Sequence, residues 1–241
     1  MKKRHLLGAV LIIFVFWWLV SIIISKPILP TPITIILHGF VMLDKLFIHI
    51  LYSFIRIILG ILIGVCLGWP LGILAGYYKN VDNFLSPIIY LLYPIPKIAL
   101  LPILMLLFGL GESTKIIVIV IIILFQIIVT VRDGIKEIDD KIFYPLAILG
   151  STQTQNIRHI VIPATLPKLF SAIRISLGTA IAVLFFSETF GTTYGLGYFI
   201  MDSLIRINYP DMYVGIMVLS TLGLTLFFII DFIHTKLVKW Q

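Results

Sequence analysis

The chain has 241 residues, of which 60% are hydrophobic, and a mean hydropathy of +1.13. A soluble globule of this size could not hide so much apolar surface, so the composition predicts a single membrane domain over residues 1–241. The formal net charge is +7. No basic cluster is interleaved with aromatic side chains, which argues against nucleic-acid binding.

Six apolar runs are long enough to cross a lipid bilayer, because a hydrocarbon core of about 30 Å takes roughly 20 residues of helix. The runs lie near residues 6–24, 50–76, 85–108, 114–131, 170–190 and 212–233. The first run is long and lacks a small-residue cleavage site, which favours an uncleaved span over a signal peptide. We therefore expect an all-α membrane protein with about six transmembrane helices.

Basic residues near the ends of these runs predict the orientation, because such residues favour the cytoplasmic side. With six alternating spans, one side receives Lys2, Lys3, Arg4, Lys79, Arg132, Lys136, Lys141, Arg158, Lys168, Lys236 and Lys239. The opposite side receives Lys26, Lys45, Lys115 and Arg206. We expect the first side to be cytoplasmic and to hold both termini.

The second run carries a regular series of glycines, namely Gly60, Gly64, Gly68, Gly72 and Gly76. In a helix this spacing gives a nearly continuous glycine face. Such a face lets another helix approach closely, and helix association in lipid depends on that packing. We expect the face to pack inside one protomer or, alternatively, to lie at a dimer axis or a moving path.

Prolines interrupt the third run at Pro94, Pro96 and Pro102. They remove backbone donors at membrane depth, where broken backbone persists only if protein or a watery cavity satisfies it. Lys97 would cost on the order of 2.5–3.5 kcal/mol in hydrocarbon, so it should face a cavity or a counter-charge. We expect a translocation path that suits an anion, with a structural kink and a snorkelling lysine as the alternative. The path would be lined by Tyr93, Pro94, Pro96 and Lys97.

The longest polar segment, about residues 133–168, is too poor in apolar residues to fold alone. Its pattern predicts a short helix, a sharp turn at Gly150 and a second helix over about 152–160, because glycine tolerates the left-handed conformation that reverses the chain. Pro163 and Pro167 should interrupt the chain between this second helix and the fifth span. The polar segment must therefore be supported by contacts outside itself.

Glu188 stands in the apolar fifth run and must be protonated, paired or close to water. Arg56 or Arg206 could be its partner. We favour a structural ion pair and keep a contact with a solute in the translocation path as the alternative.

The polar segment resembles a signature of the inner-membrane permease subunits of binding-protein-dependent ABC importers. That signature reads Glu-Ala-Ala, three residues, Gly, nine residues, Ile, one residue, Leu-Pro. Gly150, Ile160 and Pro163 stand at the matching positions, with Ile162 in place of Leu. The first third departs, since Tyr144-Pro145-Leu146 replaces Glu-Ala-Ala and its proline should kink or restart the first helix.

Three further segments are similar to the nitrate, sulfonate, taurine and thiamine-precursor branch of that family. They are Pro94-Ile95-Pro96-Lys97-Ile98-Ala99-Leu100-Leu101-Pro102, Phe108-Gly109-Leu110-Gly111-Glu112 and Gly195-Leu196-Gly197-Tyr198. The resemblance implies a type I (MetI-like) importer permease fold in the cell inner membrane, with a cytoplasmic helix-turn-helix coupling loop. It also implies a permease homodimer, cytoplasmic ATPase subunits seated on the loops, and an extracytoplasmic solute-binding protein.

The coupling loop is expected to act as a lever that passes movement of the ATPases to the spans. The residues expected to carry this coupling are Gly150, Ser151, Thr152, Gln153, Thr154, Gln155, Arg158, His159, Ile160 and Pro163. The chain has no Gly-x-x-x-x-Gly-Lys-Ser/Thr phosphate loop, so we expect no cofactor in this chain and place ATP and magnesium on the partner ATPase. An amphipathic loop on lipid headgroups is the alternative.

Other classes fit the sequence less well than a non-catalytic transport subunit. A secondary transporter or channel would need ion-coupling groups or an internal repeat. An intramembrane enzyme would need a metal site or an activated nucleophile, which the scattered histidines and the single Cys66 do not offer. For the solute we expect a small anion of the nitrate, sulfonate or taurine type, with a thiamine precursor as the alternative.

Overall fold

The computed structural model describes residues 3–239, with side chains from residue 8 onward, so Lys2 of the expected topology lies outside the described residues. Every regular element within that range is helical. In chain order the elements are α1 (Lys3–Ile24), α2 (Pro32–Val41), α3 (Leu43–Tyr77), α4 (Lys79–Leu92), η1 (Lys97–Leu100), α5 (Leu101–Phe108), α6 (Glu112–Lys136), η2 (Asp140–Ile142), α7 (Tyr144–Ile148), α8 (Gln153–Asn156), η3 (Ile157–Val161), α9 (Ile162–Glu188), α10 (Leu196–Ile205) and α11 (Tyr209–Leu237).

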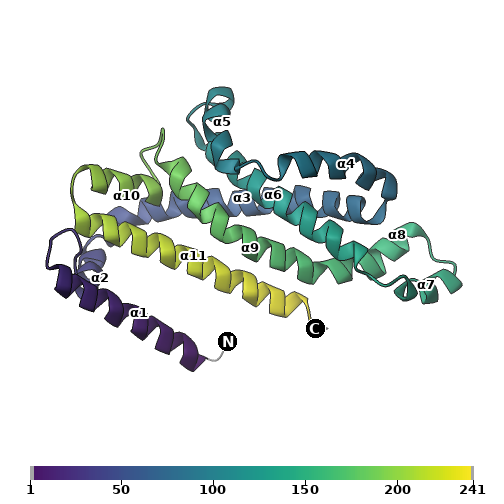
Figure 1. Cartoon of the computed structure of the whole chain (residues 1–241), viewed down its shortest axis with the longest axis horizontal. Coiled ribbons are helices and arrows are strands. Elements are labelled where there is room, and N and C mark those ends of the chain that lie inside the picture. Colours follow the sequence, from purple (N-terminus) through teal and green to yellow (C-terminus); the bar gives the residue numbers. More distant parts are fainter. Residues whose placement is uncertain (1–2, 240–241) are drawn as a thin grey trace.

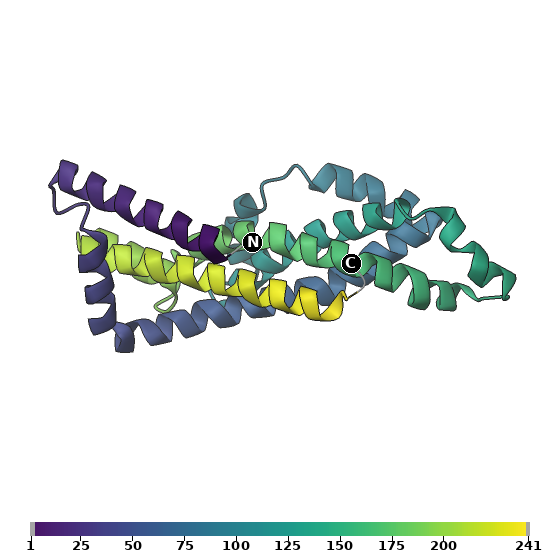
Figure 2. The ribbon, with the colours of Figure 1, turned by 90° about the horizontal axis from the view of Figure 1, so that it is seen from below.

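The long helices α3, α6, α9 and α11 run along the long axis of the molecule (Figure 1). Helix α6 packs against both α3 and α9 and so forms the centre of the bundle. The polar segment with α7 and α8 lies at one end, whereas α2 and α10 lie at the other. Helix α1 runs along the outside (Figure 2), where the rings of Trp17 and Tyr213 on α11 have centroids 5.8 Å apart.

The helices long and apolar enough to cross a membrane are α3, α6, the continuous segment Gln153–Glu188 and α11. Helix α4 and the segment Lys97–Phe108 would add one more span if counted together, although they meet at 85°. The first expected span forms α1, whose part Gly8–Ile24 is apolar but shorter than these helices. The all-helical membrane fold is therefore confirmed, while the count of six spans is not.

The glycine face of α3 packs against a face of β-branched residues on α6. The glycines meet, in turn, Ile119, Ile123, Ile127, Val131 and Ile135. A Cβ atom built on Gly64 would lie 2.8 Å from Cγ2 of Ile123, and one on Gly72 would lie 2.9 Å from Cβ of Val131. The glycines therefore let α3 and α6 approach closely within one chain, which is the first of the two expected arrangements.

Gly64→Ala should destabilise the protein by about 1–3 kcal/mol, because the added methyl group overpacks the contact between α3 and α6. The double variant Gly64→Ala/Ile123→Ala should be destabilised by less than the sum of the two single changes, since Ile123→Ala removes the Cγ2 atom that the new methyl group would meet. Gly178→Ala is the matched control, because a Cβ at Gly178 on α9 meets nothing within 4 Å. Thermal unfolding in detergent compares the variants, and equal melting temperatures for Gly64→Ala and Gly178→Ala would refute the packing argument.

Helices α8 and α9 join through the π-turn η3 into one unbroken helix, Gln153–Glu188. The expectation that Pro163 and Pro167 interrupt the chain is therefore wrong. Pro163 lies in the first turn of α9, where the wider π-turn before it makes room for the ring. Pro167 lies inside α9, at the loss of one backbone hydrogen bond. The polar end is thus joined to the spanning part of α9 by continuous helix.

Candidate functional site

Gly150 reverses the chain in the polar segment with a φ of +72°. The N–H of Ser151 donates to the carbonyl of Leu146 at 3.0 Å, and the N–H of Gly150 donates to that of Ala147 at 3.0 Å. This pair of bonds is the Schellman closure, which ends a helix at a left-handed glycine. The turn that the sequence predicts at Gly150 is therefore present, and Pro145 starts the helix before it.

A capping box opens the helix that comes after the turn. The N–H of Gln155 donates to the hydroxyl of Thr152 at 3.4 Å, and the N–H of Thr152 donates to Oε1 of Gln155 at 2.7 Å. The Ser151 hydroxyl donates to Oδ1 of Asn156 at 2.8 Å. These bonds satisfy backbone groups on both sides of Gly150 and hold the turn in this conformation.

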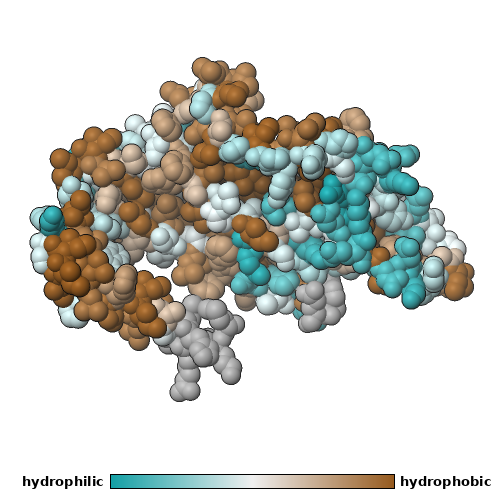
Figure 3. Space-filling view, viewed as in Figure 1, coloured by the Kyte–Doolittle hydropathy of each residue, from teal (hydrophilic) through white to brown (hydrophobic). Residues whose placement is uncertain are grey.

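Large apolar side chains stand in the open beside this turn. Ile148 is 86% exposed, Leu149 is 84% exposed and Tyr144 is 60% exposed. Hydrophilic surface gathers over the same end of the molecule (Figure 3). The other predicted contact residues Thr152, Gln153, Thr154, Gln155, Arg158 and His159 are also at least partly exposed, whereas Ile160 is buried and Pro163 is half-buried. An apolar patch rimmed by polar residues is typical of a protein contact.

The third expected span is broken, because the chain leaves α4 through Tyr93–Pro96 and continues at 85° as η1 and α5. The Lys97 ammonium donates to the carbonyls of Leu92, at 2.9 Å, and Tyr93, at 2.6 Å. It also lies 5.3 Å from the ring centroid of Tyr93 and 5.2 Å from that of Phe125. Lys97 thus stabilises the negative, carbonyl end of α4 where the helix breaks.

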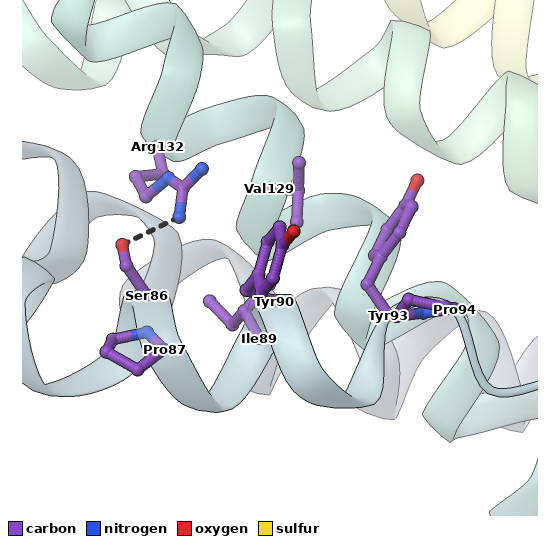
Figure 4. Close-up of a pocket in the computed structure, with 8 residues that line it drawn as sticks. All are labelled: Ser86, Pro87, Ile89, Tyr90, Tyr93, Pro94, Val129 and Arg132. Carbon is purple, nitrogen blue, oxygen red and sulfur yellow. Dashed lines mark hydrogen bonds between the residues drawn. The ribbon is translucent and has the colours of Figure 1, made fainter.

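Two cavities adjoin the break. The smaller, about 260 Å³, is lined by Tyr93, Lys97, Ile122, Phe125, Gln126, Ile175, Ser176 and Thr179. The larger, about 550 Å³, is lined by Ser86, Pro87, Ile89, Tyr90, Tyr93, Pro94, Val129 and Arg132 (Figure 4). In the larger cavity Nη1 of Arg132 donates to the Ser86 hydroxyl at 2.8 Å. Tyr93 therefore belongs to both cavities, whereas Pro96 lies in the turn and lines neither.

An ionic cluster lies at the far end of the bundle from the polar segment, and we call it the Arg56 cluster. Its buried members are Ser53, Arg56, Lys115 and Glu188, and Glu112 joins them from a half-exposed position. Nε and Nη2 of Arg56 donate to the two carboxylate oxygens of Glu112, each at 2.6 Å, and Nη1 donates to Glu188 at 2.7 Å. The carbonyl of Tyr194 and the hydroxyl of Thr192 accept from the guanidinium as well. Arg56, 1% exposed, thereby has all its donors satisfied.

Glu188 has no exposed surface and is held from several sides. It accepts from the Ser53 hydroxyl at 2.8 and 2.9 Å and from the N–H of Gly197 at 2.8 Å. Arg206, the other expected partner, pairs with Asp202 at 3.0 Å. Glu188 lies about 18 Å along α9 from Ser176, at 1.5 Å per residue. Glu188 thus forms an ion pair with Arg56, which is the arrangement favoured from the sequence, and it lies apart from the cavity that Lys97 lines.

Lys115, only 2% exposed, ties the loop before α6 to the loop after α9. Its ammonium donates to the carbonyls of Leu110 at 2.8 Å, Gly111 at 3.2 Å and Gly191 at 3.5 Å. Gly195, with a φ of +129°, leaves room for the cluster, because a Cβ there would lie 2.5 Å from Nη1 of Arg56. Within residues 3–239, no group of three or more His, Cys, Asp or Glu side chains is arranged to hold a metal ion.

Sequence reasoning missed most of the Arg56 cluster. It assigned Lys115 to the non-cytoplasmic side of the membrane and gave no role to Ser53. It did single out Glu112 and Gly197, which lie within segments of family resemblance. Those two segments meet here in space, since Glu112 accepts from Arg56 and the N–H of Gly197 donates to Glu188. Arg56 was named from the sequence as a possible partner of Glu188, but its second pairing, with Glu112, was not expected.

Comparison with known proteins identifies the family. The inner membrane component of binding-protein-dependent transport systems matches residues 64–240. The chain is 33% identical to the putative aliphatic sulfonates transport permease SsuC of Bacillus subtilis, over 91% of this chain and 80% of that protein. It is 28% identical to the taurine transport system permease TauC of Escherichia coli, over 98% and 89%. It is 30% identical to the formylaminopyrimidine transport permease ThiX of Halalkalibacterium halodurans, over 96% and 93%.

A solved structure has the same fold. The inward-facing methionine ABC transporter MetNI matches with a TM-score of 0.69 and 21% sequence identity, over 82% of this chain and 96% of that chain. The match agrees with the expected type I importer fold. From the family match over residues 64–240 and the relatives above, the chain belongs to the inner membrane components of binding-protein-dependent transport systems.

Proposed function

We propose that the chain is the permease subunit of an ABC importer, which forms the path for a small anion of the sulfonate or taurine type and is driven by a partner ATPase. The observation that carries this proposal is the preformed turn at Gly150, with Ile148 and Leu149 exposed beside it. Exposed apolar residues on a polar end need a protein to cover them. The partner ATPase would supply that cover, together with bound ATP and magnesium.

The continuous helix Gln153–Glu188 supports mechanical coupling. At 1.5 Å per residue it extends for about 54 Å, so one rigid element connects the turn to the Arg56 cluster. Its middle carries Ser176 and Thr179, which line the smaller cavity. A displacement of the turn by the ATPase would therefore shift the cavity wall and the far end of the bundle together.

The remaining partners and the orientation belong to the same proposal. The basic ends of α6 and α11 lie at the end that carries the turn, so the positive-inside preference makes this end cytoplasmic, with both termini on the same side. An extracytoplasmic solute-binding protein would then meet the opposite end, near α2 and α10. A second copy of the chain would complete the path as a homodimer.

A thiamine precursor is the second candidate solute, because the relative ThiX is named as a formylaminopyrimidine permease and is 30% identical. The lysine at the broken span favours the anion. Lys97 lines the smaller cavity, whose wall contains no acidic residue. A neutral pyrimidine would leave that cation without compensation.

Replacing an exposed apolar residue beside the turn tests the docking proposal. Leu149→Asp should weaken ATPase binding at least about tenfold, because the substitution puts a charge at an apolar anchor position of the interface. Co-purification of the ATPase with the tagged chain from membranes measures the effect. Ile205→Asp is the control, since Ile205 is 76% exposed at the other end of the molecule. If both variants retain the ATPase equally, the exposed apolar patch beside the turn is not the docking site of the ATPase.

A further inference from the structure

The smaller cavity holds a cation whose neighbours leave it incompletely satisfied. An ammonium has three N–H donors, and Lys97 uses two of them on the carbonyls of Leu92 and Tyr93. The remaining donor is available to the cavity that Lys97 lines. Two carbonyl dipoles also do not neutralise a full positive charge, so the site retains a preference for an anion.

No lining residue of this cavity is acidic. Some lysines elsewhere in the bundle pair with carboxylates, as Lys136 does with Asp82 at 2.6 Å and Lys168 with Glu137 at 2.6 Å. Lys115 instead donates to three backbone carbonyls, one more than Lys97. Lys97 has no carboxylate partner among residues 3–239. Because an uncompensated cation is costly at membrane depth, its counter-charge is expected to come from outside the chain.

Neutral donors stand on the same wall. The Tyr93 hydroxyl donates to Oε1 of Gln126 at 3.2 Å, and this bond orients the amide so that its nitrogen is the free end. One amide N–H of Gln126 goes to Thr130 at 3.3 Å, which leaves the second. Thr179 adds an exposed hydroxyl from α9. A cation, an oriented amide and a hydroxyl together match the several acceptor oxygens of one oxyanion.

The depth and size of the cavity suit a solute in transit. Gln126 lies about 21 Å along α6 from Glu112 and about 15 Å from Lys136, at 1.5 Å per residue, so the site is near the middle of the span. The volume of about 260 Å³ is below the range of roughly 300–1,000 Å³ typical of pockets for drug-sized ligands. It therefore admits a compact ion.

We propose that Lys97, Gln126 and Thr179 form a binding site for a compact oxyanion within the translocation path. The site rests on the proposed function and makes it more specific, since it assigns the oxyanion to named donors on two helices and on the broken span. Thr179 stands on the helix that begins at the coupling turn, so movement of α9 would open or close one wall of the site.

Equilibrium binding to the full-length chain in lipid nanodiscs tests the site, with radiolabelled ethanesulfonate and nitrate as separate probes and choline as a cation of similar size. The wild-type chain should bind both anions saturably and in competition with one another, and should not bind choline. Lys97→Gln should weaken binding at least tenfold, whereas Lys97→Arg should retain it within about threefold because the positive charge remains. Gln126→Leu and Thr179→Val should each weaken binding roughly tenfold.

Lys45→Gln and Thr235→Val are matched controls, because they remove the same groups from exposed positions outside the cavity. Both should bind the anions like the wild type. Absence of saturable anion binding, equal binding of choline, or unchanged binding by Lys97→Gln would each overturn the site. Co-purification of the ATPase, measured on the same preparations, reports separately on the proposed function, so the two failures are distinguishable.

Discussion

Arg56→Met should destabilise the protein by about 3–5 kcal/mol, because it leaves a buried carboxylate without its cation. Glu188 has no exposed surface, and Arg56 donates to it at 2.7 Å while holding Glu112 with two further bonds. The substitution keeps most of the side-chain volume, so the loss comes from charge and hydrogen bonds. Thermal unfolding and the yield of folded protein from membranes measure it.

A second variant separates charge from packing in the Arg56 cluster. Arg56→Met/Glu188→Gln removes both buried charges, so it should recover part of the stability lost by Arg56→Met alone. The control Arg206→Met breaks an exposed pair with Asp202 and should cost less than about 1 kcal/mol. Similar melting temperatures for Arg56→Met and Arg206→Met would show that the cluster does not stabilise the fold.

Gly150→Val should reduce ATPase binding by roughly 5–30-fold, because a left-handed conformation costs a β-branched residue about 1–2 kcal/mol or more. Gly150 has a φ of +72°, and a Cβ there meets nothing within 4 Å, so the cost is one of backbone conformation and not of collision. The displaced turn would no longer present Ile148 and Leu149 together. Titration of the purified ATPase onto the reconstituted chain measures the affinity.

Gly150→Asn is the informative companion, because asparagine tolerates the left-handed region. It should bind the ATPase within about threefold of the wild type. The overall melting temperature of Gly150→Val should change little, since the turn lies outside the packed bundle and is exposed. An equal loss of binding in both variants would mean that the conformation at Gly150 is not what docking requires.

Local patterns in the sequence were sufficient to predict the features that depend on neighbouring residues. The turn at Gly150, the break at Pro94 and Pro96, and the glycine face of α3 all arise from the properties of single residue types at short spacing. The structure adds what each one touches. Gly64, for example, meets Ile123, and no spacing rule names that residue.

Long-range pairing and span lengths were harder to predict. The sequence left Arg56 and Arg206 as alternative partners of Glu188, and the structure selects Arg56, 132 residues away. The pairing of Arg56 with Glu112, across 56 residues, had no local signal in the sequence. The short helix α2 was missed although its start is marked by the cap Thr31 and by Pro32. Helix α9 was expected to break at Pro163, because a π-turn that accommodates proline leaves no local signature.

Crosslinking from the exposed turn tests the central claim that a separate ATPase drives this chain through Gly150 and its neighbours. Leu149→Cys, in a Cys66→Ser background that removes the single native thiol, places the reactive group beside the turn. In membranes that contain the whole transport system, the cysteine should crosslink to the ATPase, with a yield that changes when ATP is added. Labelling of Leu149→Cys by an impermeant maleimide from outside intact cells, or crosslinks to lipid alone, would contradict the account.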